Sequence, residues 1–149
     1  MKVVNRKARY NYELLDKFEV GVVLSGAEVK SVKEGKISLD DAFARINDEG
    51  EVWLYNAHIH PYQFADNRDY KPTRPRKLLL HKKEIISLKS KVEAKRLVLV
   101  PTACYLRGRT IKMELALGKG KKTWDKREAI KRRDLKREAE REIRIKNYE

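Results

Sequence analysis

Alternating hydrophobic and polar positions divide the first 117 residues into short extended elements. Residues 18–24 (FEVGVVL) are rich in β-branched side chains and predict a strand. Residues 51–59 predict a second strand, which forms a hairpin with the alternating residues 40–47. Residues 110–117 alternate cleanly and predict a strand with one apolar face.

Two segments between these strands have helical signals. Ser25 and Glu28 have the spacing of a capping box, and Gly35 can end the helix that they begin. Apolar side chains at i, i+3 and i+7 within residues 81–96 predict an amphipathic helix. Residues 60–76 hold three of the four prolines and no period, which predicts a long loop.

Residues 97–106 complete the predicted sheet. They form an apolar strand that is interrupted at Pro101, and the polar residues 1–9 are expected to lead in as a flexible segment or a short helical turn. Short strands joined by turns, with only two helices between them, do not suit a doubly wound parallel sheet. We therefore predict a mainly β fold with flanking helices, a small closed antiparallel barrel of the oligonucleotide-binding type.

Residues 118–149 differ from the rest of the chain in composition. They contain 13 Lys and Arg against 7 Asp and Glu, a net charge of +6 out of +14 for the whole chain. Their apolar side chains are too few to offset the entropy of ordering the segment. We therefore expect two units, an RNA-binding barrel over residues 1–117 and a basic tail that is disordered when free.

The excess positive charge points to a polyanionic partner. Residues 1–117 still carry +8, so the basic character is not confined to the tail. Nucleic acid is favoured over an anionic membrane, because the tail has no continuous bulky apolar face and no stretch approaches the length of a membrane span. A single cysteine, Cys104, fits a reducing compartment, and we expect it to be a buried structural thiol in a cytoplasmic protein.

The motifs of common enzymes are missing from the sequence. It has no P-loop, no nucleophile elbow and no HExxH, so we expect neither catalysis nor a cofactor. His58 and His60, with Asp66 or Asp69, could in principle bind a metal, but ordinary histidines at a strand end are the favoured interpretation.

Aromatic side chains fall into two groups by their neighbours. Three that lie within apolar strands are expected in the core, namely Phe43, Trp53 and Tyr55. Four that lie among polar residues are candidates for stacking on bases, namely Tyr10, Tyr12, Tyr62 and Tyr70. In GKGKKTW, residues 118–124, glycines, lysines and an aromatic occur together, a combination suited to phosphates and bases.

Six segments in this order resemble the SmpB (small protein B) family, the bacterial partners of transfer-messenger RNA. They are NRKARYNY (5–12), FEVGVVLSGAEVKSVKEGK (18–36), GEVWLYNAHIHPY (50–62), RPRKLLLHKKEI (74–85), KMELALGKGKK (112–122) and DKREAIKRRDLKRE (125–138). The resemblance implies a non-enzymatic protein that binds the tRNA-like domain of transfer-messenger RNA. With elongation factor Tu, the complex would enter stalled ribosomes, where the unfinished peptide is tagged.

The resemblance also implies roles for individual residues. Those that match the family's RNA-binding positions are Asn5, Tyr12, Glu19, Leu79 and Lys112. Those that match the ribosomal decoding site and the start of the tail are Lys119, Lys121, Lys122, Trp124, Asp125, Lys126 and Arg127. The tail would become helical on the ribosome, next to small-subunit rRNA and in the empty message channel. The protein is expected to be a monomer without a membrane partner.

Two other functions remain open. A general RNA chaperone or ribosome-associated RNA-binding module would share the basic barrel. A metal-dependent nuclease would use His58, His60, Asp66 and Asp69. Competition between the tRNA-like RNA and a random duplex distinguishes a general RNA chaperone from a protein specific for transfer-messenger RNA. An RNA cleavage assay with a divalent metal tests for the nuclease.

Overall fold

The computed structural model describes residues 1–121 together with Arg133 and Arg137. Its elements, in chain order, are β1 (Lys2–Val4), α1 (Arg6–Asn11), β2 (Tyr12–Val22), α2 (Gly26–Lys33), β3 (Ile37–Ser38), β4 (Phe43–Ile46), β5 (Val52–Tyr55), β6 (His58–Ile59), β7 (Arg76–Leu79), α3 (Lys82–Lys95), β8 (Val98–Arg107) and β9 (Thr110–Gly120).

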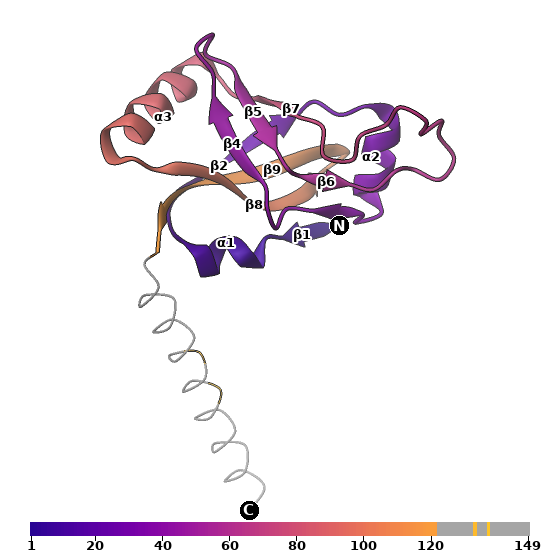
Figure 1. Ribbon diagram of the computed structural model, residues 1–149, viewed down its shortest axis with the longest axis horizontal. Helices are drawn as coiled ribbons and strands as arrows, with labels where there is room; N and C mark the ends of the chain where they lie inside the picture. The colour runs from indigo at the N-terminus through magenta and orange to yellow at the C-terminus, as the bar shows by residue number, and fades with distance from the viewer. Residues whose placement is uncertain (122–132, 134–136, 138–149) are drawn as a thin grey trace, which may run out of the picture.

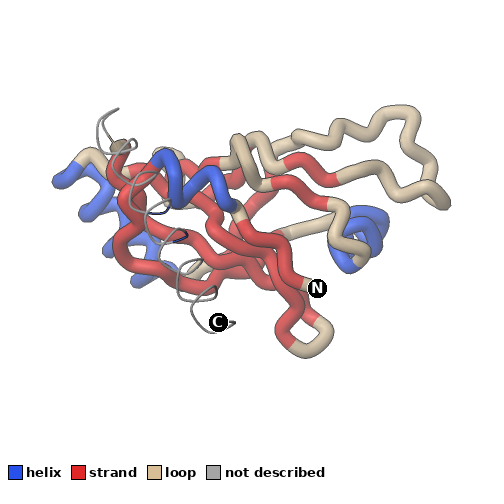
Figure 2. The backbone as a smooth tube through the Cα atoms, turned by 90° about the horizontal axis from the view of Figure 1, so that it is seen from below, coloured by secondary structure: helices blue, strands red, loops and turns tan. Residues whose placement is uncertain are grey.

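The fold is mainly β with a few helices, as the sequence predicts. Seven antiparallel strands follow one another in the order β1-β8-β4-β5-β7-β2-β9, and β8 pairs with β9 as well (Figure 1). A two-stranded sheet of β3 and β6 stands beside them. In Figure 2, α1 and α3 lie at one end of the sheet, and α2 and the long loop after β6 lie at the other. The helices therefore leave much of the outer sheet surface uncovered.

The core is formed by the inward side chains of the long strands. On β9, Met113, Leu115 and Leu117 are almost fully buried, and Val20 of β2 faces them. The alternation over residues 110–117 is thus confirmed. The strand continues to Gly120, three residues beyond the expected end of the barrel, because residues 118–120 pair with the start of β2.

The predicted capping box of α2 is confirmed. Ser25 Oγ accepts a hydrogen bond from the Glu28 backbone N–H at 3.2 Å, and Glu28 Oε1 accepts one from the Ser25 N–H at 3.0 Å. Gly35 follows the last helical turn with φ +77°, a conformation that glycine adopts without steric cost. These local signals fix both ends of α2.

Glu28 also belongs to a buried ion network that the sequence did not reveal. Its carboxylate accepts hydrogen bonds from Arg74 and Arg76, and Tyr70 OH lies 3.1 Å from its Oε2. The Arg76 guanidinium additionally donates to the carbonyls of Ala57 and Pro72. The second end of the long loop is therefore attached to α2, and Arg76 also joins it to Ala57, before the first end. Tyr70 serves this network, so its hydroxyl is a structural group.

The structure differs from the sequence predictions in two segments. Residues 2–4 form β1, which pairs antiparallel with β8. The short helical turn expected as one alternative for residues 1–9 is confirmed by α1, and the flexible alternative is wrong. The strand expected over 51–59 is split, because Asn56 adopts φ 61°, in the left-handed region that asparagine tolerates better than most residues.

The three aromatic side chains expected in the core lie on the other face of the sheet. On β5, Val52 and Leu54 point inward and are buried, so the alternate residues Trp53 and Tyr55 point outward and are half-buried. Phe43 of β4 stacks on Tyr55 with ring centroids 5.5 Å apart. By contrast, Cys104 is buried as expected, and burial raises the pKa of its thiol to about 12.

Candidate nucleic-acid interface

One row of outward residues crosses four neighbouring strands. Gly21 of β2 is opposite Leu79 of β7 on one side and Lys112 of β9 on the other, and Lys112 is opposite Tyr105 of β8. A Cβ on Gly21 would lie 3.3 Å from Leu79 Cβ, so the glycine lets Leu79 pack close to the strand. Leu79 is 53% exposed, which presents an apolar side chain beside a lysine.

Glu19 lies two residues before Gly21 on the same face of β2. Its carboxylate accepts hydrogen bonds from Tyr105 OH and, at 2.9 Å, from Arg107 Nη1. These two bonds, the tyrosine's first, lower the pKa of Glu19, and nearby Lys112 adds to the effect. The same hydrogen bond raises the pKa of Tyr105 to about 12. Glu19 is therefore a fixed anion within a basic surface, and its cationic partner is Arg107.

The structure thus brings together Glu19, Leu79 and Lys112 of the residues predicted from the resemblance. Tyr105 and Arg107 complete the group, which we call the cross-strand surface: Glu19, Gly21, Leu79, Tyr105, Arg107 and Lys112. Sequence reasoning missed Tyr105 and Arg107. Tyr105 and Arg107 alternate along one strand, which predicts that they share a face of the sheet. This alternation does not show which strand lies next to theirs.

Asn5 lies away from the cross-strand surface and is only 2% exposed. Its side-chain Nδ2 donates to the carbonyls of Leu39 and Pro101 at 2.9 and 2.8 Å, and its Oδ1 accepts from the Ala8 N–H at 3.1 Å. The amide caps α1 and attaches this helix to β8. Its hydrogen-bonding groups are engaged inside the protein.

Tyr12 lies at the other end of β2, next to the place where the described chain leaves the sheet. It pairs with Gly120 in the strand register, and its ring packs over Gly118. A Cβ on Gly118 would lie 3.1 Å from a Val100 methyl and 3.2 Å from Tyr12 Cβ, so this glycine lets Val100 and Tyr12 pack closely on β9. In the sequence, the same glycine belongs to a segment, residues 118–124, that suits phosphates and bases.

Of the residues predicted for the decoding site, two are described. Lys119 is exposed near the end of β9, opposite Glu13. The Lys121 backbone N–H donates to the Asn11 carbonyl at 3.0 Å, and its Nζ donates to the Arg9 carbonyl at 2.9 Å. The others lie outside the described residues, namely Lys122, Trp124, Asp125, Lys126 and Arg127.

The residues considered for a metal site do not converge within the described part of the chain. The rings of His58 and His60 are 4.7 Å apart, edge to face. Asp66 is occupied by a bidentate contact with Arg68, at 2.7 Å from Nη2. In residues 1–121, 133 and 137, no three His, Cys, Asp or Glu side chains are grouped as a metal site requires.

Among the helices that the structure describes, none is long and apolar enough to cross a bilayer.

Comparison with known proteins gives a consistent result. The family model described as SmpB protein matches residues 2–145. The SsrA-binding protein of Carboxydothermus hydrogenoformans is 49% identical over 142 residues, which is 95% of each chain. That of Persephonella marina is 50% identical over 140 residues, covering 93% of this chain and 91% of the relative.

A solved structure is also similar to this one. It is described as "tmRNA-SmpB: a journey to the center of the bacterial ribosome", with a TM-score of 0.68 and 44% sequence identity. The match covers 82% of this chain and 85% of the other. With the family model matching almost its whole length, the chain belongs to the SmpB family.

Proposed function

We propose that this protein binds the tRNA-like domain of transfer-messenger RNA and delivers it to stalled ribosomes for trans-translation. The observation that carries the proposal is the cross-strand surface, where Leu79, Lys112 and a fixed Glu19 carboxylate adjoin on a chain of net charge +14. Membership of a family with SsrA-binding relatives adds support.

The cross-strand surface suits recognition of a folded RNA by shape and backbone contacts. Lys112 would neutralise a phosphate, and Leu79 would pack on a ribose or a base. The Glu19 carboxylate is held by Tyr105 and Arg107, yet two oxygens have more acceptor positions than these bonds use. It would accept a hydrogen bond from a ribose hydroxyl or a base amino group.

Asn5 and Tyr12 would act by position. Asn5 holds α1 against β8, and α1 carries Arg6, Lys7 and Arg9, a group of cations suited to phosphates. Tyr12 lies beside the start of the tail, where its half-buried ring would contact RNA that follows the tail.

In this proposal the tail beyond residue 127 is disordered in the free protein, and the tail becomes helical on the ribosome. Residues 118–120 of the predicted tail belong to β9. As a helix, residues 122–149 would span about 42 Å, enough to extend from a decoding centre into an empty message channel. The residues that would contact small-subunit rRNA are Lys119, Lys121, Lys122, Trp124, Asp125, Lys126 and Arg127.

The strands that carry the cross-strand surface are proposed to close into an oligonucleotide-binding barrel. Support comes from the pairings, since β8-β4-β5-β7-β2-β9 returns to β8 through the β8–β9 pair. The protein is proposed to act as a cytoplasmic monomer without catalysis, and to meet elongation factor Tu through the RNA complex.

The test is capture of the protein from a bacterial lysate with sequencing of the bound RNA. Transfer-messenger RNA should be enriched over other structured RNAs. In a competition assay, the tRNA-like RNA should displace the bound RNA, whereas a random duplex of equal length should not. Equal displacement by both would favour a general RNA chaperone and contradict the proposal.

A further inference from the structure

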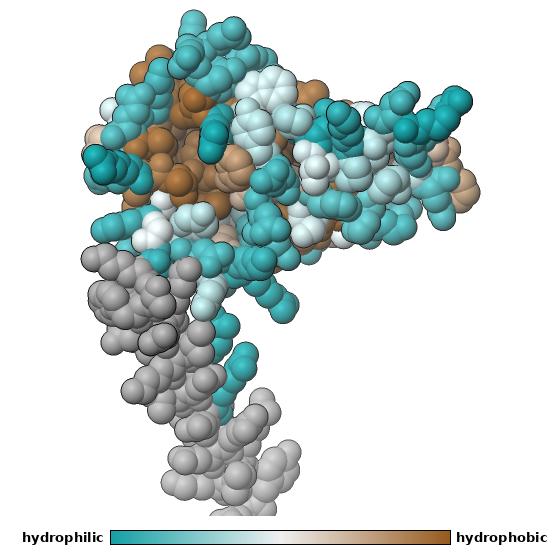
Figure 3. Space-filling view, viewed as in Figure 1, coloured by the Kyte–Doolittle hydropathy of each residue, from teal (hydrophilic) through white to brown (hydrophobic). Residues whose placement is uncertain are grey.

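A groove of about 700 Å³ with an apolar floor and a polar rim lies between α1, β4, α3 and the first half of β8. Its origin is a divergence of two strands. Among the described residues, β4 and β8 pair only through Ala44 and Leu99, so their outer faces separate on this side. Figure 3 shows the resulting hydrophobic surface in brown at the left of the view, below α3.

The floor of the groove is formed by apolar side chains. Apolar residues that line it include Tyr12, Phe43, Ile46, Val92, Val98 and Val100. Val98 remains 40% exposed although it lies in a strand. Such a hollow favours an aromatic or aliphatic side chain as its occupant.

The rim of the groove is acidic on a strongly basic protein. The carboxylates that line it are Asp40, Asp41, Asp48 and Glu93, against the two cations Arg45 and Lys89. Asp41 is also paired with Lys7, whose Nζ lies 3.5 Å from its Oδ1. A phosphate backbone is therefore disfavoured here, and a positively charged peptide segment is favoured.

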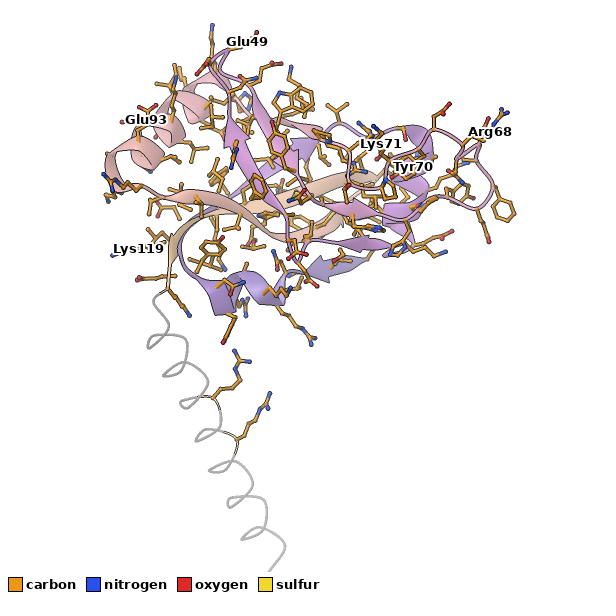
Figure 4. All side chains as sticks on the ribbon, viewed as in Figure 1. Glu49, Arg68, Tyr70, Lys71, Glu93 and Lys119 are labelled. Carbon is orange, nitrogen blue, oxygen red and sulfur yellow. The ribbon has the colours of Figure 1, made fainter. Side chains whose placement is uncertain are left out.

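The basic tail begins at the mouth of this groove. Asn11, which lines the groove, accepts the hydrogen bond from the Lys121 N–H. Figure 4 shows Lys119 on the same side of the molecule as Glu93 of α3. Trp124 follows Lys121 by three residues, a span of about 10 Å when extended.

We propose that in the RNA-free protein residues 122–127 fold back along this groove and place the indole of Trp124 on its apolar floor. The flanking cations Lys122, Lys126 and Arg127 then face the acidic rim. A tryptophan covers roughly 150–250 Å² when it is buried, which gives this short segment an anchor that its charges alone lack. The tail beyond residue 127 takes no part in the contact.

One consequence rests on the proposed function: a docked Trp124 is withheld from other RNAs until the decoding site competes for it. The docking itself involves no RNA. It shifts with the relative affinity of the tail for the groove and for rRNA.

The test uses the fluorescence of the full chain. The sequence has two tryptophans, so Trp53→Phe leaves Trp124 as the only one, and excitation at the red edge of the absorption band excites it without the tyrosines. Its emission should be blue-shifted and severalfold less quenched by acrylamide than after the added change Val98→Arg. Val23→Arg is the matched control, because Val23 is 46% exposed and lies outside the groove lining. Equal quenching in both variants would overturn the proposal.

A second measurement covers the case in which Val98→Arg disturbs the strand. Trp124→Ala changes only the tail, and the methyl NMR signals of Val92 and Val98 should shift when the indole ring is removed, while those of Val23 stay in place. Unshifted groove signals would overturn the proposal. Transfer-messenger RNA binding is measured separately, so failure of the docking and failure of the proposed function are told apart.

Discussion

Arg76 of β7 donates from both Nε and Nη2 to one carboxylate oxygen of Glu28 on α2, at 2.8 and 2.5 Å. The side chains are 0% and 1% exposed. This pair joins a helix to the sheet at the end of the long loop. Because removal of one partner leaves a buried charge unpaired, the pair is essential to the fold even where its net contribution is small.

Glu28→Gln should therefore lower the free energy of unfolding by about 3–5 kcal/mol. Urea unfolding followed by circular dichroism measures the change. Glu34→Gln is the control, since Glu34 pairs with Lys36 on the surface and its loss should cost under about 1 kcal/mol. Similar losses in both variants would show that the buried network contributes no more to the free energy of unfolding than an exposed ion pair.

The same carboxylate predicts a pH dependence of stability. Burial would raise the pKa of Glu28, but hydrogen bonds from Arg74, the Ser25 N–H and Arg76 outweigh it and lower the pKa from 4.5 to about 2. The group therefore contributes stability above about pH 4.5, and this contribution is lost as the pH falls toward 2. Between pH 6 and pH 2, the temperature of thermal unfolding should fall less steeply in Glu28→Gln than in the unchanged protein. An unchanged slope would assign acid sensitivity to other carboxylates.

Lys112→Ala should weaken binding to the tRNA-like RNA and reduce the salt slope of log K by about 1, because one phosphate contact is lost. Binding is measured at several salt concentrations. The control is Lys33→Ala, which removes the same charge from an exposed residue of α2 outside the cross-strand surface. It should leave the salt slope nearly unchanged. Equal effects would mean that only net charge matters.

A chain ending at Lys121 should keep most of its affinity for the tRNA-like RNA, because the cross-strand surface lies within residues 19–112. A chain ending at Leu117 should be less stable, since residues 118–120 pair with the start of β2 and Lys121 is bonded to α1. Binding and thermal unfolding of both chains test this. Loss of RNA affinity in the longer one would contradict the assignment of binding to the sheet.

Trp124→Ala should leave the affinity for transfer-messenger RNA nearly intact while impairing peptide tagging on stalled ribosomes. A stacked base contributes roughly 1–3 kcal/mol, which is the expected scale of the loss on the ribosome. Replacing Lys119, Lys121 and Lys122 together should impair tagging more severely. Should Trp124→Ala weaken both activities equally, Trp124 would belong to the protein's own RNA surface.

The features that sequence predicts well here are those with local causes. The capping box of α2 uses residues three apart, and the hairpin of β4 and β5 uses a short turn. The outward position of Lys112 follows from alternation alone, and the family resemblance adds its role in RNA binding.

What the sequence could not predict depends on distant partners. Asn5 donates hydrogen bonds to carbonyls 34 and 96 residues away in the sequence. Arg76 donates to a carboxylate 48 residues away. Similarly, Glu19 meets Arg107 across 88 residues. No local pattern encodes such neighbours, so a residue that resembles an RNA ligand and one that supports the fold look alike in sequence.

The pairing of β2 with β9 bears on how the protein is made. Tyr12 is opposite Gly120 and Gly21 is opposite Lys112. The first long strand, β2, therefore cannot pair with β9 until the last long strand has been synthesised. Contacts of such high sequence separation slow folding, because a long loop must close before they form. During synthesis, the cross-strand surface cannot assemble until nearly all of residues 1–120 have emerged, so a nascent chain lacks the RNA binding that we propose for this surface before that moment.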